Sequence, residues 1–208
     1  MSPEIIKVCG ITSLGDGLLA AGQGANALGL IFFEGSPRCV AVETAARIAS
    51  AVPRGVLRVG LFVNESAERI REVVNVVGLD IVQLHGDERP EECAALGDLR
   101  IWKAFRVGDN FSLESLRDYR CEAFLLDAAA KDGSYGGSGQ TFPWSIAIQA
   151  KHYGRIVLAG GLHGGNVAEA IRQVQPWGID ASSKLEQQPG VKDPEKVRQY
   201  LEAAKSVK

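Results

Sequence analysis

The sequence lacks a charge excess of either sign, a long uninterrupted apolar run and a paired-cysteine motif. Its 23 lysine and arginine residues nearly balance 25 aspartate and glutamate residues, which gives a formal net charge of −2 and a pI near 6.0. A chain with this charge carries no strongly basic signature of the kind that marks nucleic-acid-binding proteins. Glycine or charged residues interrupt the apolar runs well before the about 20 residues that a membrane-spanning helix needs. We therefore expect neither a nucleic acid nor a membrane as a partner.

Two further absences concern targeting and metal binding. The first ten residues, MSPEIIKVCG, contain no basic segment followed by an apolar one, so they do not look like a secretory signal. The four cysteines, at positions 9, 39, 93 and 121, form no Cys-x-x-Cys pair and have no metal-ligand spacing. We expect reduced thiols, no metal and a cytoplasmic location. The hydrophobic content of 46% over 208 residues is enough for one full core, so we expect a single domain over residues 1–208.

Short β-rich runs alternate with helical patterns along the chain. Strands are predicted at eight places: 5–11, 27–33, 57–63, 80–85, 100–107, 123–128, 155–161 and 177–182. Helical spacing is seen at 66–77, 112–119, 164–174 and 193–207, and less securely in the glycine-containing stretch 13–24. This alternation predicts an α/β protein with a parallel sheet, and eight units suit a (β/α)₈ TIM barrel. The alternative, an open doubly wound sheet, is disfavoured because "CGITSLGDG" lacks the Gly-x-Gly-x-x-Gly spacing after the first strand.

The chemistry of such a barrel lies at the C-terminal ends of its strands. In the first strand, Lys7 and Cys9 share one face, because successive side chains alternate sides. Ile6 and Val8 belong against the helices, so Lys7 and Cys9 are predicted to point into the barrel. A nearby ammonium favours the thiolate, and Cys9 is then a base or a nucleophile. The alternative is that Cys9 is a small core residue.

Asp127 ends the sixth strand, where a carboxyl group is either a helix N-cap or a catalytic acid whose protonated form is favoured by burial. Strands one and six are far enough apart around the ring for Cys9 and Asp127 to face each other across the mouth, one as base and the other as acid.

The last two strand ends favour a phosphate site. Gly160 and Gly161 follow the seventh strand, and the stretch 179–193 supplies hydroxyl and amide groups after the eighth. Loops at these two places often hold phosphate through backbone N–H groups, although two glycines also simply allow a turn. Arg38 follows the second strand and is either a clamp for a carboxylate or a solvated loop residue. His85 and Asp87 either line the cavity or cap the next helix.

Together these segments resemble phosphoribosylanthranilate isomerase, a family of tryptophan biosynthesis. The resemblance runs from residue 6 to about residue 193. Its motifs, in order, are KVCGIT, GLIFFEGSPR, VGLFVN, VQLHGDE, LLDA, GGSGQTFPW, LAGGL and IDASS followed by PGVKD. It implies a (β/α)₈ barrel without a cofactor that carries out an Amadori rearrangement of a phosphosugar–anthranilate substrate. We expect a monomer or a homodimer.

The resemblance also assigns roles. Cys9 is similar to the family's general base, Asp127 to its general acid and Arg38 to the arginine that holds the anthranilate carboxylate. The remaining substrate-binding residues that we expect are Lys7, His85, Gly160, Gly161, Asp180, Ser182 and Ser183, of which the two glycines and two serines match the phosphate cradle and Asp180 lies at the edge of the substrate. For this chemistry we expect Lys7 to lower the pKa of Cys9.

Two positions depart from the family. Lys184 follows the paired serines where glycine is usual, and Cys39 stands where an aromatic residue is common. We read both as tuning of the site. Two other functions are considered: a non-catalytic phosphosugar-binding barrel, and another aminoaldose isomerase such as that of histidine biosynthesis. The second is disfavoured because that family resembles a twofold-repeated barrel with aspartates in both acid–base roles, whereas this chain has Cys9 and no half-barrel repeat.

Overall fold

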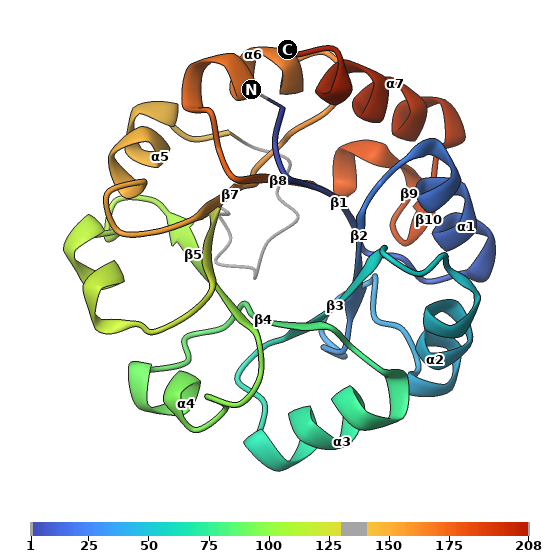
Figure 1. The fold of residues 1–208 in the computed structure, drawn as a ribbon, viewed down its shortest axis with the longest axis horizontal. Helices are drawn as coiled ribbons and strands as arrows, with labels where there is room; N and C mark the ends of the chain where they lie inside the picture. Colours follow the sequence, from blue (N-terminus) through green and yellow to red (C-terminus); the bar gives the residue numbers. More distant parts are fainter. Residues whose placement is uncertain (1, 130–140, 208) are drawn as a thin grey trace.

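The computed structural model describes residues 2–129 and 141–207, and its centre is a closed barrel of eight parallel strands (Figure 1). The ring closes where β1 pairs with β8, with Ile5 opposite Gly178 and Lys7 opposite Asp180. Closure confirms the predicted (β/α)₈ barrel and excludes the open sheet. In chain order the strands are β1 (Ile5–Cys9), β2 (Ala27–Ile31), β3 (Leu57–Phe62), β4 (Ile81–Leu84), β5 (Ile101–Val107), β6 (Ala123–Ala128), β7 (Ile156–Leu158) and β8 (Gly178–Ala181).

Helices surround the barrel on its outside (Figure 1). They are α1 (Leu14–Gln23), α2 (Val42–Ala51), α3 (Ala67–Val77), α4 (Pro90–Ala94), α5 (Trp144–Ala150), α6 (Val167–Val174) and α7 (Pro194–Lys205). Caps explain several boundaries: the Ser66 side chain accepts the Arg69 N–H at the start of α3, and Asp193 accepts two N–H groups at the start of α7. In the described segments no helix is long and apolar enough to cross a membrane.

One predicted helix is different in the structure. The segment 112–119 forms the 3₁₀ helix η1 (Leu113–Asp118) instead of an α-helix. A segment of this length gains little from isolated helix formation, and single 3₁₀ turns are common as connectors. The helical elements that follow β4 and β5 are therefore short, because α4 has five residues and η1 has six.

The core has two layers separated by the barrel wall. Inside the barrel lie Ile5, Ala27, Val59, Ile81, Trp102, Ala104, Ala123, Leu125, Val157 and Ala159. A larger cluster fills the space between strands and helices, and Ile6 and Val8 belong to it. Cys9 belongs to a third, small cluster with Ile31, Leu61 and Val63. The sides taken by the β1 residues are therefore those that alternation predicts, with Ile6 and Val8 against the helices.

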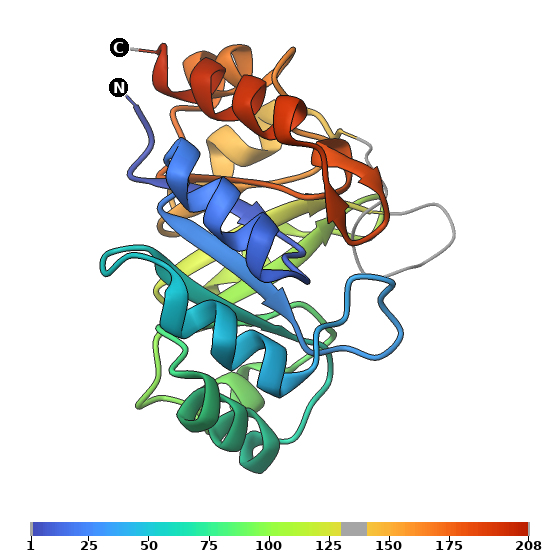
Figure 2. The same cartoon turned by 90° about the vertical axis from the view of Figure 1, so that its right-hand side faces the viewer.

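After β8 the chain forms a short 3₁₀ turn, η2 (Ser183–Leu185), and an antiparallel hairpin of β9 (Glu186–Gln188) and β10 (Val191–Lys192). Figure 2 shows this hairpin at one end of the barrel and both chain termini at the other. The hairpin lies at the C-terminal ends of the strands, and it was not predicted from the sequence.

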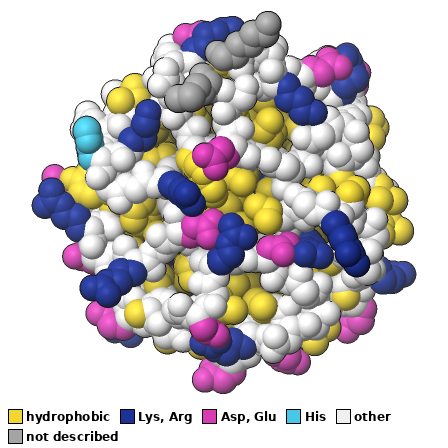
Figure 3. All heavy atoms as spheres, viewed as in Figure 1, with side chains coloured by type: hydrophobic (Ala, Val, Ile, Leu, Met, Phe, Trp, Pro, Cys, Tyr) yellow, Lys and Arg dark blue, Asp and Glu magenta, His cyan; other side chains and the backbone are white. Residues whose placement is uncertain are grey.

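The opposite end of the barrel carries positive and negative side chains interspersed around apolar ones (Figure 3). Ion pairs between neighbouring strand starts contribute to this mixture: Arg58 Nε lies 2.7 Å from Asp80 Oδ2, and Arg100 Nε lies 2.6 Å from Glu122 Oε2. Neither sign of charge dominates this face.

Candidate active site

Lys7 and Asp180 form a buried ion pair at the junction of β1 and β8. The Lys7 Nζ atom donates to Asp180 Oδ2 at 2.8 Å, and the lysine side chain is 0% exposed. Burial works against the charged ammonium, but Asp180 and Cys9 outweigh it, so the pKa of Lys7 is raised. The lysine charge is thus largely balanced by a carboxylate of the chain itself.

Cys9 lies beside this pair and is buried, with 3% of its surface exposed to solvent. Burial raises the pKa of the Cys9 thiol, and the opposing effect of the Lys7 charge is smaller. The prediction that Lys7 leaves Cys9 with a lowered pKa is therefore wrong. The sequence pattern indicates the nearby Lys7 ammonium. It does not indicate that Cys9 loses its hydration on burial, or that the Asp180 carboxylate lies near enough to disfavour the thiolate.

Asp127 points to the same end of the barrel from β6. Its Oδ2 lies 3.6 Å from His85 Nε2, and its Oδ1 accepts the N–H of Ala128 at 2.9 Å. The Gln83 Nε2 group lies 2.9 Å from His85 Nδ1. When the amide donates to Nδ1, the ring proton is on Nε2 and faces Asp127. The next described helix, α5, has Pro143 as its N-cap, so Asp127 does not cap it.

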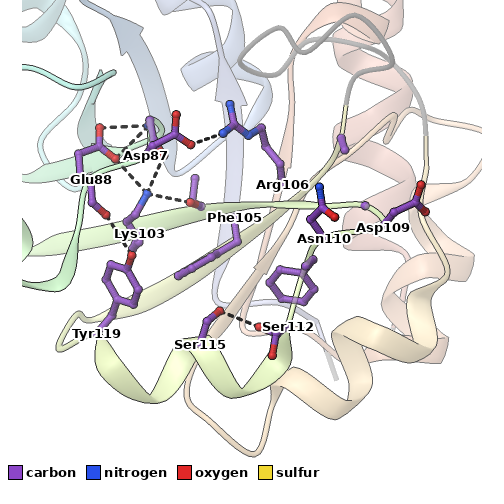
Figure 4. A pocket seen from close by; sticks show the side chains of 15 residues that line it. Asp87, Glu88, Lys103, Phe105, Arg106, Asp109, Asn110, Ser112, Ser115 and Tyr119 are labelled. Atoms are coloured by element: carbon purple, nitrogen blue, oxygen red, sulfur yellow. Dashed lines mark hydrogen bonds and ion pairs between the residues drawn. The ribbon is translucent and has the colours of Figure 1, made fainter.

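The loop that carries His85 is fixed by two buried charged residues that the sequence analysis missed. The Glu88 carboxylate accepts the N–H groups of Gly86 at 3.0 Å and of Asn64 at 2.8 Å. Lys103 Nζ donates to Glu88 Oε2 and to the Gly86 carbonyl, both at 2.9 Å (Figure 4). A lysine within the apolar strand IWKAF was the signal for this pair, because a buried ammonium requires partners.

The same pair forms one wall of a cavity of about 450 Å³ between β5 and η1 (Figure 4). Tyr119, which directly follows η1, also lines this cavity, and its hydroxyl donates to the Glu88 carbonyl at 3.0 Å. At the barrel mouth, Arg106 is paired with Asp87. Asp87 therefore lies near the mouth, and the β4 loop is held from both the inside and the outside of the barrel wall.

The predicted phosphate residues surround a small hollow. Gly160 and Gly161 have positive φ angles of 86° and 63°, which glycine adopts at little cost. Asp127 and Asp180 line the hollow with them. The other lining residues are Ala159, Leu162, Ala181, Ser182, Ser183 and Lys184. The structure thus brings together one candidate catalytic residue and the whole predicted cradle.

The two departures from the family are accommodated. Lys184 lies in the 3₁₀ turn η2, and in the described segments the non-glycine residues with positive φ are Asn64 and Gln175. Lysine at this position is therefore without backbone strain. Cys39 is exposed on the loop after β2.

Arg38 is not a solvated loop residue. Its guanidinium is bound by Glu186 of the β9–β10 hairpin, with Nε at 2.9 Å from Oε1 and Nη2 at 2.8 Å from Oε2. The Lys192 Nζ atom binds the same carboxylate at 2.8 Å. Neither residue was predicted from the sequence, although Glu186 lies between IDASS and PGVKD and Lys192 is part of PGVKD. The Arg38 guanidinium, which was predicted to bind a substrate carboxylate, thus already binds a carboxylate of the chain.

Comparison with known proteins gives the family. A sequence model described as "N-(5'phosphoribosyl)anthranilate (PRA) isomerase" matches residues 6–203. The chain belongs to this family. A PRA isomerase from Rubrobacter xylanophilus is 50% identical over 204 residues, which are 97% of this chain and 98% of that protein. The predicted family and enzyme class, an isomerase of tryptophan biosynthesis, are confirmed.

Solved structures of PRA isomerases have the same fold. One, in complex with reduced 1-(o-carboxyphenylamino)-1-deoxyribulose 5-phosphate, has a TM-score of 0.85 and 36% identity, and the alignment covers 97% of this chain and 98% of that one. Another, of monomers of the dimeric enzyme from Thermotoga maritima, has a TM-score of 0.85 and 37% identity with the same coverage.

Residues 136–140 of the motif GGSGQTFPW lie outside the described residues. Among residues 2–129 and 141–207, no group of three or more His, Cys, Asp or Glu side chains is arranged to hold a metal ion.

Proposed function

We propose that the chain converts N-(5-phosphoribosyl)anthranilate to 1-(2-carboxyphenylamino)-1-deoxyribulose 5-phosphate, with Cys9 as general base and Asp127 as general acid. The observation that carries the proposal is the single hollow shared by Asp127, Asp180 and the cradle of Gly160–Gly161 and Ser182–Ser183. Cys9 is next to that hollow, because its carbonyl accepts the Ser182 hydroxyl at 3.0 Å and its neighbour Lys7 binds Asp180.

Substrate binding would use the two ends of this arrangement. The backbone N–H groups of the loops after β7 and β8, with the serine hydroxyls, suit the three oxygens of a phosphate. Glu186 takes the Nε and Nη2 donors of Arg38, so the anthranilate carboxylate would use the remaining N–H donors of the guanidinium. Gly10 leaves room for both groups, because a Cβ atom there would lie 2.8 Å from Arg38 Cδ and 2.9 Å from Ser182 Oγ.

The reaction then needs two proton transfers. Protonated Asp127 gives its proton to the furanose ring oxygen, the C1–O bond breaks, and the ring opens to a Schiff base. His85 Nε2 faces this carboxyl group at 3.6 Å from Oδ2, which is longer than a hydrogen bond. The Cys9 thiolate next removes the C2 proton, which gives an enolamine that tautomerises to the ketone. A placed acid or base typically contributes on the order of 10²–10⁴-fold to such a step.

No step requires a cofactor, and we propose none. We also propose one domain over residues 1–208, a cytoplasmic location and a monomeric or homodimeric enzyme, with no membrane or nucleic acid as partner. A non-catalytic phosphosugar-binding barrel is less well supported, because Cys9 and Asp127 are both present at the mouth.

The test is the fluorescence decay of freshly prepared phosphoribosylanthranilate with the wild-type protein, followed from pH 5 to 10. We expect substrate loss well above uncatalysed hydrolysis and the ketose phosphate as product. The ascending limb of kcat/KM should be lost in Cys9→Ala, and no wild-type catalysis at any pH would refute the proposal.

A further inference from the structure

We infer that Glu186 and Lys192 are positioning residues for the reaction, and that together they set how readily the Cys9 thiol ionises. The inference rests on the proposed function, in which Cys9 is the base. It concerns residues of the β9–β10 hairpin, and it follows from how charges are shared among the buried groups beside Cys9.

The Glu186 carboxylate is shared by two cations. Arg38 binds it in bidentate fashion from the β2–α2 loop, and Lys192 binds Oε1 from β10. The exposed fractions of the three side chains are 13% for Arg38, 4% for Glu186 and 0% for Lys192. Water therefore screens these charges poorly, and each acts strongly on its neighbours.

The hairpin is tied to the segment that carries Cys9. The Thr12 hydroxyl donates to the Gly190 carbonyl at 2.5 Å, and Lys192 Nζ lies 3.4 Å from the Ser182 carbonyl. The hydroxyl of Ser182 donates in turn to the Cys9 carbonyl. The Lys192 charge is close enough to act on the thiol, where it works in the same direction as Lys7.

A count of charges gives the effect of this arrangement. The charged groups that act on Cys9 are Lys7 on β1, Asp180 on β8 and Lys192 on β10, and Lys192 is tied in turn to Glu186 on β9, which also binds Arg38 of the β2–α2 loop. Three of them are cations and two are carboxylates, because Glu186 has two cationic partners whereas Asp180 has one. Farther around the mouth, outside this group, His85 Nε2 lies 3.6 Å from Asp127 Oδ2. A buried uncompensated charge is unfavourable, so ionisation of Cys9 would neutralise the surplus.

Lys192 provides the positive charge that is not matched by a carboxylate in this group. Lys7 is already matched by Asp180, so removal of Lys192 would leave the set neutral and the thiolate uncompensated. Removal of the Glu186 charge would release both cations from their shared carboxylate, and because the Arg38 guanidinium stays protonated, at least one surplus cation would remain beside the thiol. The Lys192 ammonium also has to remain charged: burial lowers its pKa, and the 2.8 Å contact with Glu186 opposes that effect.

The two changes therefore predict different shifts. The pH dependence of alkylation of Cys9 by iodoacetamide is measured in the substrate-free protein, with the Cys9 peptide quantified by mass spectrometry. We compare pH midpoints, because the plateau rate also depends on access to the buried thiol. At a fixed pH below the midpoint, Lys192→Met should reduce the thiolate fraction roughly tenfold or more, and Glu186→Gln should leave it unchanged or raise it.

Two lysine variants serve as controls. Lys192→Arg keeps the cation and should keep the midpoint near the wild-type value. Lys196→Met removes a neighbouring exposed lysine whose Nζ donates to the Glu186 backbone carbonyl at 2.8 Å, and it should leave the midpoint unchanged.

The inference is overturned if Lys192→Met leaves the midpoint unchanged or lowers it, or if Glu186→Gln raises the midpoint as Lys192→Met does, since loosening of the hairpin alone would act equally in both. If Lys192→Met does not fold, Glu186→Gln decides: an unchanged or lowered midpoint supports the inference, and a raised one refutes it. Alkylation needs no turnover, so absence of isomerase activity would refute the proposed function without affecting this result.

Discussion

Gly29 on β2 leaves the space that the Cys9 side chain occupies, and its replacement by alanine is a direct test of the geometry around the base. A Cβ atom at position 29 would lie 2.5 Å from Cys9 Sγ and 2.9 Å from Cys9 Cα. Both distances are well inside van der Waals contact, and one of the two atoms belongs to the backbone of the neighbouring strand. Gly29→Ala therefore has to displace either the thiol or β1.

The expected cost follows from overpacking of a buried site, which is typically about 1–3 kcal/mol. For a protein of this length, about 2–4 °C of melting temperature is lost per kcal/mol. We expect a lowered midpoint in urea or thermal unfolding. Displacement of a catalytic group by about 1 Å can cost on the order of 100-fold, so kcat should fall by that order.

A matched glycine provides the control. Gly22 lies in α1, where an added Cβ meets nothing within 4 Å. Gly22→Ala should leave kcat unchanged and stabilise the protein by up to about 1 kcal/mol through helix propensity. If Gly29→Ala matched the wild type in both stability and kcat, the packing described around Cys9 would be incorrect.

Three further changes have defined outcomes. Lys103→Met should lower the free energy of unfolding by about 3–5 kcal/mol, because it leaves the Glu88 carboxylate buried and unpaired. The double variant Lys103→Met with Glu88→Gln should recover part of this loss in urea unfolding. A double variant no more stable than Lys103→Met would contradict the prediction. Burial opposes ionisation of Glu186, but its two cationic partners outweigh burial and lower the pKa of the carboxyl group. The stability that the ionised Glu186 contributes is therefore present above the ordinary glutamate pKa and is lost as pH falls through the lowered pKa. The difference in unfolding free energy between wild type and Glu186→Gln should shrink from pH 6 to pH 3, and a constant difference would refute this. Lys184→Gly should raise KM about two- to fivefold and weaken inhibition by inorganic phosphate with kcat unchanged, whereas an unaltered inhibition constant would exclude a phosphate contact.

Much of the fold follows from local patterns in the sequence. Strand alternation predicts all eight barrel strands, and the period of two along β1 predicts that Ile6 and Val8 face the helices, which leaves Cys9 at the mouth. The ends of β6, β7 and β8 likewise predict that Asp127, Gly160–Gly161 and Ser182–Ser183 lie at one end of the barrel. Each of these inferences needs only neighbouring residues and the topology of a parallel barrel.

The missing parts depend on contacts between distant segments. Arg38 and Glu186 are 148 positions apart in the chain, and nothing near Arg38 indicates its partner. The direction of the Cys9 pKa could not be read from Lys7 alone, because it is a balance of burial and several charges. Lys103 was visible as a charged residue within an apolar strand, but its partner Glu88 is identified only by the fold.

The most direct test of the account is kcat/KM for phosphoribosylanthranilate in Cys9→Ala and Asp127→Asn beside the wild type, measured by fluorescence decay at the wild-type pH optimum. If Cys9 is the base and Asp127 the acid, kcat/KM of each variant should fall on the order of 10²–10⁴-fold or more while circular dichroism shows an intact barrel. If either folded variant retained activity within tenfold of the wild type, that residue would not be the acid or the base.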